Sequence, residues 1–111
     1  MGSLEKHNRL IDIVEDYLKD SDNCRTLREL EYELLGKHGE ADLLYIDWEK
    51  EKAYNYEIKC SPYHRKKAYS QLEKNMELLE KRYGIDNIES YFIYYIDEDK
   101  ETFAIERYDL K

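Results

Sequence analysis

Residues 53–60 read Ala53-Tyr54-Asn55-Tyr56-Glu57-Ile58-Lys59-Cys60, an aromatic-rich run with two charged side chains near its end. Successive side chains of a strand point to opposite faces, so Glu57 and Lys59 share one face while Ile58 points to the other. The pattern therefore predicts a strand that presents an anion and a cation side by side.

A second strand-like run lies just upstream, over residues 41–48, and the polar stretch 49–52 can close a hairpin between the two runs. Pairing outward from that turn brings Asp42 towards the Glu57 to Lys59 end of its partner strand. Two carboxylates beside an ammonium group can hold a hard divalent cation and orient a water molecule next to it. We therefore expect a metal site formed by Asp42 and Glu57, with Lys59 beside it.

The rest of the chain extends this hairpin into an α/β fold. Helical and alternating apolar patterns predict, in chain order, a helix over 4–18, strands over 27–35, 41–48 and 53–60, a helix from the Ser61-Pro62 cap to Gly84, and strands over 88–96 and 102–108. The run Tyr91–Ile96 is apolar on both faces, which is typical of a strand covered on both sides. The expected architecture is a mixed β-sheet flanked by helices, in the order αβββαββ.

Composition indicates one domain over residues 1–111, with a single modest core. Charged residues make up 40% of the chain and hydrophobic residues 41%, and Pro62 is the one proline, so extensive disorder is not expected. No apolar run approaches the roughly 20 residues that span a bilayer, and the first residues lack a signal-peptide core. The sequence predicts a soluble, cytoplasmic protein without a membrane partner.

The net charge of -8 argues against a nucleic-acid partner, because affinity for DNA comes largely from neutralising phosphates. Positive charge is nevertheless concentrated in His64, Arg65, Lys66 and Lys67, directly after the candidate site. Binding depends on the potential over the contact face rather than on the total charge. This basic turn is a candidate phosphate-binding element, with Tyr63 and Tyr69 as candidate base-stacking residues; a solvated basic turn is the alternative.

An aspartate on the second strand, Glu57-Ile58-Lys59 on the third and a capped helix after them resemble the PD-(D/E)XK nuclease superfamily, and within it the RecB-type exonucleases and archaeal Holliday junction resolvases. Residues 39–43, Gly-Glu-Ala-Asp-Leu, resemble the family's approach to its metal-binding aspartate, with Ala41 where a proline often stands. Gln71 resembles the RecB-type glutamine, although Asn75 occupies the position of the usual aromatic residue. The resemblance implies a restriction endonuclease-like core.

The resemblance also implies an activity, that of a Mg²⁺- or Mn²⁺-dependent nuclease acting on DNA rather than RNA. Asp42, Glu57 and the carbonyl of Ile58 would bind the metal, and Lys59 would position or deprotonate the attacking water. The family commonly supplies a further acid from upstream, for which Glu33 is the preferred candidate. Four alternatives stay open: Glu31, Glu40, Glu5 and Glu15. Because a chain this small offers little surface to contact a duplex, we expect a homodimer or a larger protein partner.

The acid-x-lysine triplet is weak by itself, because it recurs at residues 98–100 and 109–111. Only the copy at Glu57 lies within a strand pattern, after a strand-borne aspartate and before a capped helix. Three alternatives compete with the nuclease: a solvated face of an amphipathic hairpin, a catalytically inactive nuclease fold, and an acidic interaction module that mimics nucleic acid or mediates dimerisation.

Overall fold

The computed structural model describes residues 3–18 and 23–109. Its elements, in chain order, are α1 (Ser3–Glu15), β1 (Cys24–Leu34), β2 (Lys37–Asp47), β3 (Lys52–Lys59), η1 (Pro62–His64), α2 (Arg65–Tyr83), β4 (Asn87–Asp97) and β5 (Thr102–Tyr108). The expected α/β architecture, with one mixed sheet of five strands and two α-helices, is confirmed. The order differs from αβββαββ by the short 3-10 helix η1 between β3 and α2.

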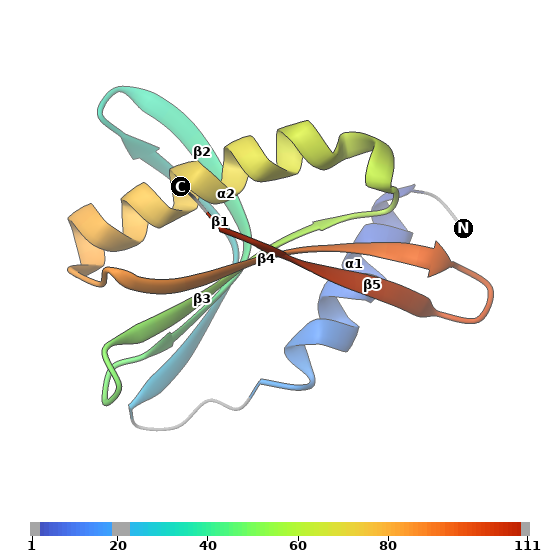
Figure 1. The fold of residues 1–111 in the computed structure, drawn as a ribbon, viewed down its shortest axis with the longest axis horizontal. Helices are drawn as coiled ribbons and strands as arrows, with labels where there is room; N and C mark the ends of the chain where they lie inside the picture. Colours follow the sequence, from blue (N-terminus) through green and yellow to red (C-terminus); the bar gives the residue numbers. More distant parts are fainter. Residues whose placement is uncertain (1–2, 19–22, 110–111) are drawn as a thin grey trace.

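The strands lie side by side in the order β1-β2-β3-β4-β5 (Figure 1). The strands β1, β2 and β3 form an antiparallel meander, α2 crosses over to place β4 parallel to β3, and β5 returns antiparallel to β4. A parallel pair needs such a long crossover, whereas antiparallel neighbours need only a tight turn. The helix α2 therefore begins at the end of β3, beside the Glu57 to Lys59 segment.

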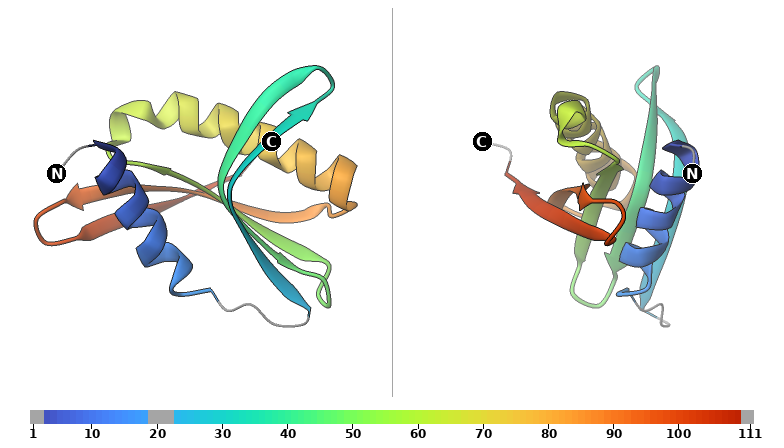
Figure 2. Two further views of the ribbon diagram at one scale, coloured as in Figure 1. Left: turned by 180° about the vertical axis from the view of Figure 1, so that it is seen from behind. Right: turned by 90° about the vertical axis from the view of Figure 1, so that its right-hand side faces the viewer.

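The two helices cover opposite faces of the sheet, as the edge-on view in Figure 2 shows. On one face Leu10, Ile11 and Val14 of α1 pack with residues of β2, β3 and β4. On the other face α2 packs against the sheet through its own apolar stripe. In β4, Phe92 belongs to the α2 side and Ile93 to the α1 side, so the expectation of a strand covered on both faces is confirmed.

Local signals set the ends of α2. The Ser61 hydroxyl accepts the Tyr63 N–H at 3.2 Å, but Pro62 opens the 3-10 turn, and the α-helix begins three residues later than expected, at Arg65. The helix ends at Gly84, whose left-handed conformation (φ 67°) favours glycine. Among the described residues, no helix is long and apolar enough to span a membrane.

The β1–β2 hairpin reaches beyond the rest of the sheet. Its turn is Leu35-Gly36, both with positive φ, so β2 begins at Lys37 rather than at residue 41 as expected. The β2–β3 ladder ends at the pair Leu43–Tyr56, while β1 and β2 stay paired to Leu34–Lys37. Figure 1 shows this two-stranded ribbon rising beside α2 and away from β3. The strand β2 thus leaves β3 at Asp42.

Candidate functional site

Asp42 lies at the point where β2 separates from β3. Ala41 and Leu44 both belong to the core cluster on the α2 side, so the strict alternation of β2 is broken between them. The Asp42 carboxylate accepts the backbone N–H of Ile58 at 2.8 Å and thereby replaces a ladder hydrogen bond. This interaction buries Asp42 to 5% exposure and fixes it beside β3.

Glu57 is the neighbouring carboxylate on β3 and is 1% exposed. Its Oε2 atom is buried and has no hydrogen-bond partner, and such a group costs about 1–3 kcal/mol. The Lys59 Nζ atom lies 3.9 Å from Glu57 Oε1, and the Lys59 side chain is partly exposed. The residues Asp42, Glu57 and Lys59, expected to meet on the basis of sequence, are therefore together, with the carboxylates deep and the ammonium nearer to solvent.

His7 of α1 completes this group, and sequence reasoning missed it. Its Nε2 atom lies 3.4 Å from Asp42 Oδ2, the same oxygen that accepts the Ile58 amide. Helical periodicity could have identified His7 from the sequence. His7 precedes Leu10 and Ile11 by three and four residues and so continues the buried stripe of α1.

The surroundings move the two carboxyl groups in opposite directions. Burial, the hydrogen bond to Asp42 and the negative charge of Asp42 raise the pKa of Glu57 well above its ordinary value. Burial also opposes ionisation of Asp42, but hydrogen bonds from His7, Glu57 and the Ile58 amide outweigh it and lower the pKa of Asp42. Opposite shifts of this kind are expected where two like charges are buried together.

A cleft of about 360 Å³ opens above this group. It is lined by His7 from α1, Glu40 and Asp42 from β2, Glu57 and Lys59 from β3, and Lys67, Ser70, Gln71 and Lys74 from α2. The lining combines a buried acidic floor with cations on the wall that α2 supplies. Such an arrangement can place a phosphate group between positive side chains and a pair of carboxylates.

A buried polar network fixes Gln71 in the wall of the cleft. The Asn55 amide nitrogen donates to the Leu72 carbonyl (3.0 Å), which turns Asn55 Oδ1 towards Asn75 Nδ2 (3.1 Å). Asn75 Oδ1 in turn accepts from Tyr32 Oη (2.6 Å) and Gln71 Nε2 (2.9 Å). Because Gln71 Nε2 is committed to this network, its carbonyl oxygen is the end left to accept a hydrogen bond. The buried Asn75 thus has a structural role.

Glu33, the preferred upstream acid, does not line the cleft. Glu33 is exposed on β1, outside the cleft, and its backbone carbonyl accepts a hydrogen bond from Arg82. Of the five glutamates considered, Glu40 is the one that lines the cleft, and its charge contributes to the raised pKa of Glu57. The reason is the separation of β2 from β3, which brings the segment just before Asp42 to the edge of the cleft.

The basic turn is divided between two environments. Arg65 forms a two-pronged ion pair with Glu106 of β5 at 2.8 and 3.0 Å, and Tyr69 and Tyr94 donate to the same carboxylate. The Tyr69 ring stacks on Tyr108, with centroids 4.5 Å apart. Tyr63, His64 and Lys66 are exposed and do not line the cleft. Of the predicted nucleic-acid-binding residues, the structure brings Lys67 alone to the cleft, where Lys74, which was not predicted, joins it.

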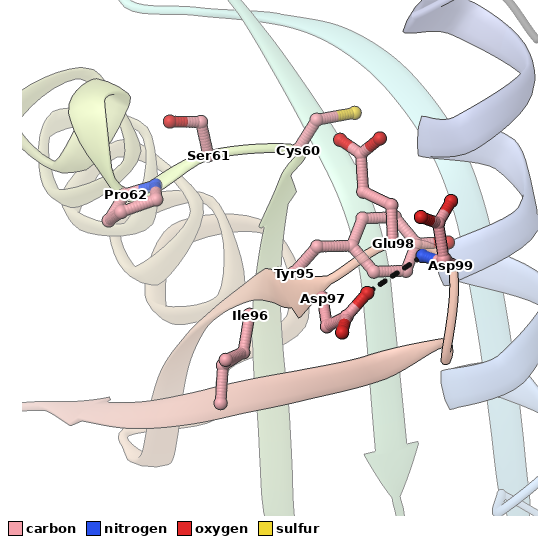
Figure 3. Close-up of a pocket in the computed structure, with 8 residues that line it drawn as sticks. All are labelled: Cys60, Ser61, Pro62, Tyr95, Ile96, Asp97, Glu98 and Asp99. Atoms are coloured by element: carbon pink, nitrogen blue, oxygen red, sulfur yellow. Dashed lines mark hydrogen bonds between the residues drawn. The ribbon is translucent and has the colours of Figure 1, made fainter.

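A larger hollow, of about 430 Å³, lies beyond the C-terminal ends of β3 and β4 and is drawn in Figure 3. Two of its acids have partners: Asp97 Oδ1 accepts the backbone amides of Asp99 (3.0 Å) and Lys100 (3.3 Å), and Glu98 pairs with Lys6. These contacts cap the β4–β5 turn and the start of α1. Unlike Asp42 and Glu57, none of the three acids that line this hollow, Asp97, Glu98 and Asp99, is buried.

Within the described part of the chain, no three His, Cys, Asp or Glu side chains form a ready-made metal-binding cluster. No family model, curated protein or solved structure matches this chain.

Proposed function

We propose that this protein is a divalent-metal-dependent nuclease that hydrolyses phosphodiester bonds, with DNA as its substrate, at Asp42, Glu57 and Lys59. The observation that carries the proposal is the buried Asp42–Glu57 pair on the floor of a cleft whose walls carry lysines. A mixed sheet with the aspartate on β2 and Glu57 and Lys59 on β3 also supports a restriction endonuclease-like core. The burial of both acids argues against a merely solvated hairpin face.

The donor set suits Mg²⁺ or Mn²⁺. A buried, unpartnered Oε2 on Glu57 beside a second carboxylate is a pair of groups that a cation would satisfy. Because Mg²⁺ is usually held by one or two carboxylates and keeps several waters, a third acidic side chain is not required. Asp42, Glu57 and the Ile58 carbonyl would hold the ion. When bound, it would polarise the scissile phosphate and lower the pKa of a coordinated water.

The remaining residues have roles that follow from their positions. His7 and the Ile58 amide both contact Asp42 Oδ2, so they orient the carboxylate. The Lys59 ammonium, at the mouth of the cleft, can neutralise charge that develops on the phosphate and hold the attacking water. The Gln71 carbonyl is a hydrogen-bond acceptor and therefore suits a water or an amino group better than a phosphate oxygen.

Cleavage of end-labelled single-stranded and duplex DNA, with Mg²⁺, Mn²⁺ or EDTA, tests the function directly. We expect strand scission with either metal and none in EDTA. An RNA strand of the same sequence provides the matched comparison of substrate class. Intact substrates with both metals, at protein concentrations that bind the DNA, would contradict the proposal and favour a catalytically inactive relative.

A further inference from the structure

Three lysines that form no ion pair with any described residue run from the cleft towards the tip of the β1–β2 ribbon. Lys67 and Lys74 line the cleft from α2. Lys74 also borders a small neighbouring hollow together with Lys37 and His38, the first residues of β2. The two depressions therefore meet at Lys74. We call Lys67, Lys74 and Lys37 the lysine track.

The charge of this track is available to a ligand. Over residues 3–18 and 23–109, no carboxylate forms an ion pair with any of the three lysines. Neighbouring cations are already engaged, because Arg65 pairs with Glu106 and Arg82 donates to the Glu33 carbonyl. The acid in the smaller hollow, Glu77, pairs with Lys81 at 3.0 Å. Exposed cations left unneutralised along one line are what a phosphate backbone requires.

We propose that the lysine track binds the backbone of the strand being cut, on one side of the scissile bond; this inference rests on the proposed nuclease function. Lys67 and Lys74 are seven residues apart on one helix, which is about 10 Å at about 1.5 Å per residue. That span matches about three nucleotides at about 3.4 Å of rise per nucleotide. The substrate must therefore extend for several nucleotides in one direction beyond the cut.

The net negative charge of the chain makes the lysine track the favoured path for a nucleic-acid strand. With a net charge of -8, surfaces away from the cleft repel a polyanion, so a local line of unpaired lysines guides the strand to one face. Glu40, at the cleft, limits how closely phosphates approach that edge and leaves the α2 side as the favoured path.

Two triple variants test the track. Lys37→Gln, Lys67→Gln and Lys74→Gln together remove it, whereas Lys50→Gln, Lys66→Gln and Lys100→Gln remove three exposed lysines that also lack ion pairs but lie outside both depressions. The readout is fluorescence anisotropy of a labelled 15-nucleotide single strand in EDTA, over a series of salt concentrations. Each phosphate contact contributes about 0.7 to the slope of log affinity against log salt. We expect the track variant to lose about 2 from that slope and the control variant to keep the slope of the wild type.

Equal salt slopes and equal affinities for the two triple variants would contradict the proposal that the lysine track binds the strand. A separate assay keeps that outcome distinct from failure of the nuclease proposal: hydrolysis of bis(p-nitrophenyl) phosphate by the wild-type protein with Mn²⁺. This small diester reaches the carboxylates without the track. Hydrolysis of the diester together with equal slopes would reject the track alone. If the wild type leaves the diester and the oligonucleotide intact, the nuclease proposal fails, while the binding comparison still decides the track.

Discussion

Glu57 is the residue on which the proposed function depends most, because its environment destabilises the folded protein in the absence of a ligand. A carboxyl group buried beside a second carboxylate, with one oxygen unpartnered, is destabilising. Such a group persists where a ligand supplies what the fold lacks, and stability and function are commonly opposed at such positions. The sequence indicated which residues would meet, since strand alternation and the hairpin register are local properties.

Glu57→Gln should therefore stabilise the metal-free protein. The amide preserves the shape and can donate to Asp42, so we expect a gain of about 1 kcal/mol at pH 7. The raised pKa of Glu57 means that the folded wild type binds a proton more tightly than the unfolded chain. Its stability must then fall as pH rises above the ordinary value of 4.5, and the variant should lack this fall. Thermal unfolding in EDTA from pH 4.5 to 8 measures both effects.

The exposed Glu80 of α2 provides the control, because Glu80→Gln changes the same functional group outside the cleft. It should leave the pH dependence of the thermal midpoint close to that of the wild type. A Glu57→Gln protein that melts below the wild type throughout this pH range would show that the carboxyl group is structural.

Lys59→Ala should separate chemistry from metal binding. The ammonium lies at the mouth of the cleft and the carboxylates are the proposed metal ligands, so calorimetric Mn²⁺ affinity should change little. Loss of a donor that acts on developing charge costs about 10² to 10³ in turnover. Single-turnover cleavage at saturating metal measures that loss. Turnover restored by extra metal alone would assign Lys59 to the metal site instead.

At the scale of elements, the helix α2 has two sides with different tasks. One end docks on β5 through Arg65, Glu106 and Tyr69, while the side that carries Lys67 and Lys74 faces the cleft. Periodicity predicted the helix and the Gly84 cap. It did not predict that Asn75 is buried while its neighbour Met76 is only partly buried. Asn75 is held by Asn55 of β3 and Tyr32 of β1, and the periodicity of α2 gives no information about residues on those strands.

Arg65→Gln should therefore weaken the fold and leave nucleic-acid binding unchanged. The variant loses both ion-pair contacts to Glu106, and we expect the thermal midpoint to drop by a few degrees. The slope of log DNA affinity against log salt should stay at the wild-type value, since this guanidinium is already neutralised. Lys66→Gln, its exposed neighbour, should alter neither quantity. A reduced salt slope for Arg65→Gln, with an unchanged slope for Lys66→Gln, would show that Arg65 contacts the nucleic acid.

At the scale of the whole molecule, the site depends on where β2 separates from β3. That separation brings Glu40 rather than Glu33 to the cleft, and it lets the β1–β2 ribbon continue beside α2 with Lys37 near its tip. No local pattern specifies such a divergence, because it results from the packing of three layers. The same limit applies to His7, which reaches Asp42 from the opposite face of the sheet. The carboxylates were predictable from neighbouring strands, whereas their partners from distant segments were not.

Cleavage by Asp42→Asn is the most direct test of whether the buried carboxylate pair performs the hydrolysis. Asparagine is nearly isosteric, and its side-chain oxygen can still accept the Ile58 amide, so the fold should be retained. The measurement is the single-turnover rate on end-labelled DNA across a Mg²⁺ titration, with thermal unfolding as the check on folding. We expect the wild type to cleave in proportion to metal occupancy and the folded variant to show no metal-dependent cleavage. A folded Asp42→Asn protein that cleaves at the wild-type rate would place the chemistry elsewhere and contradict the account.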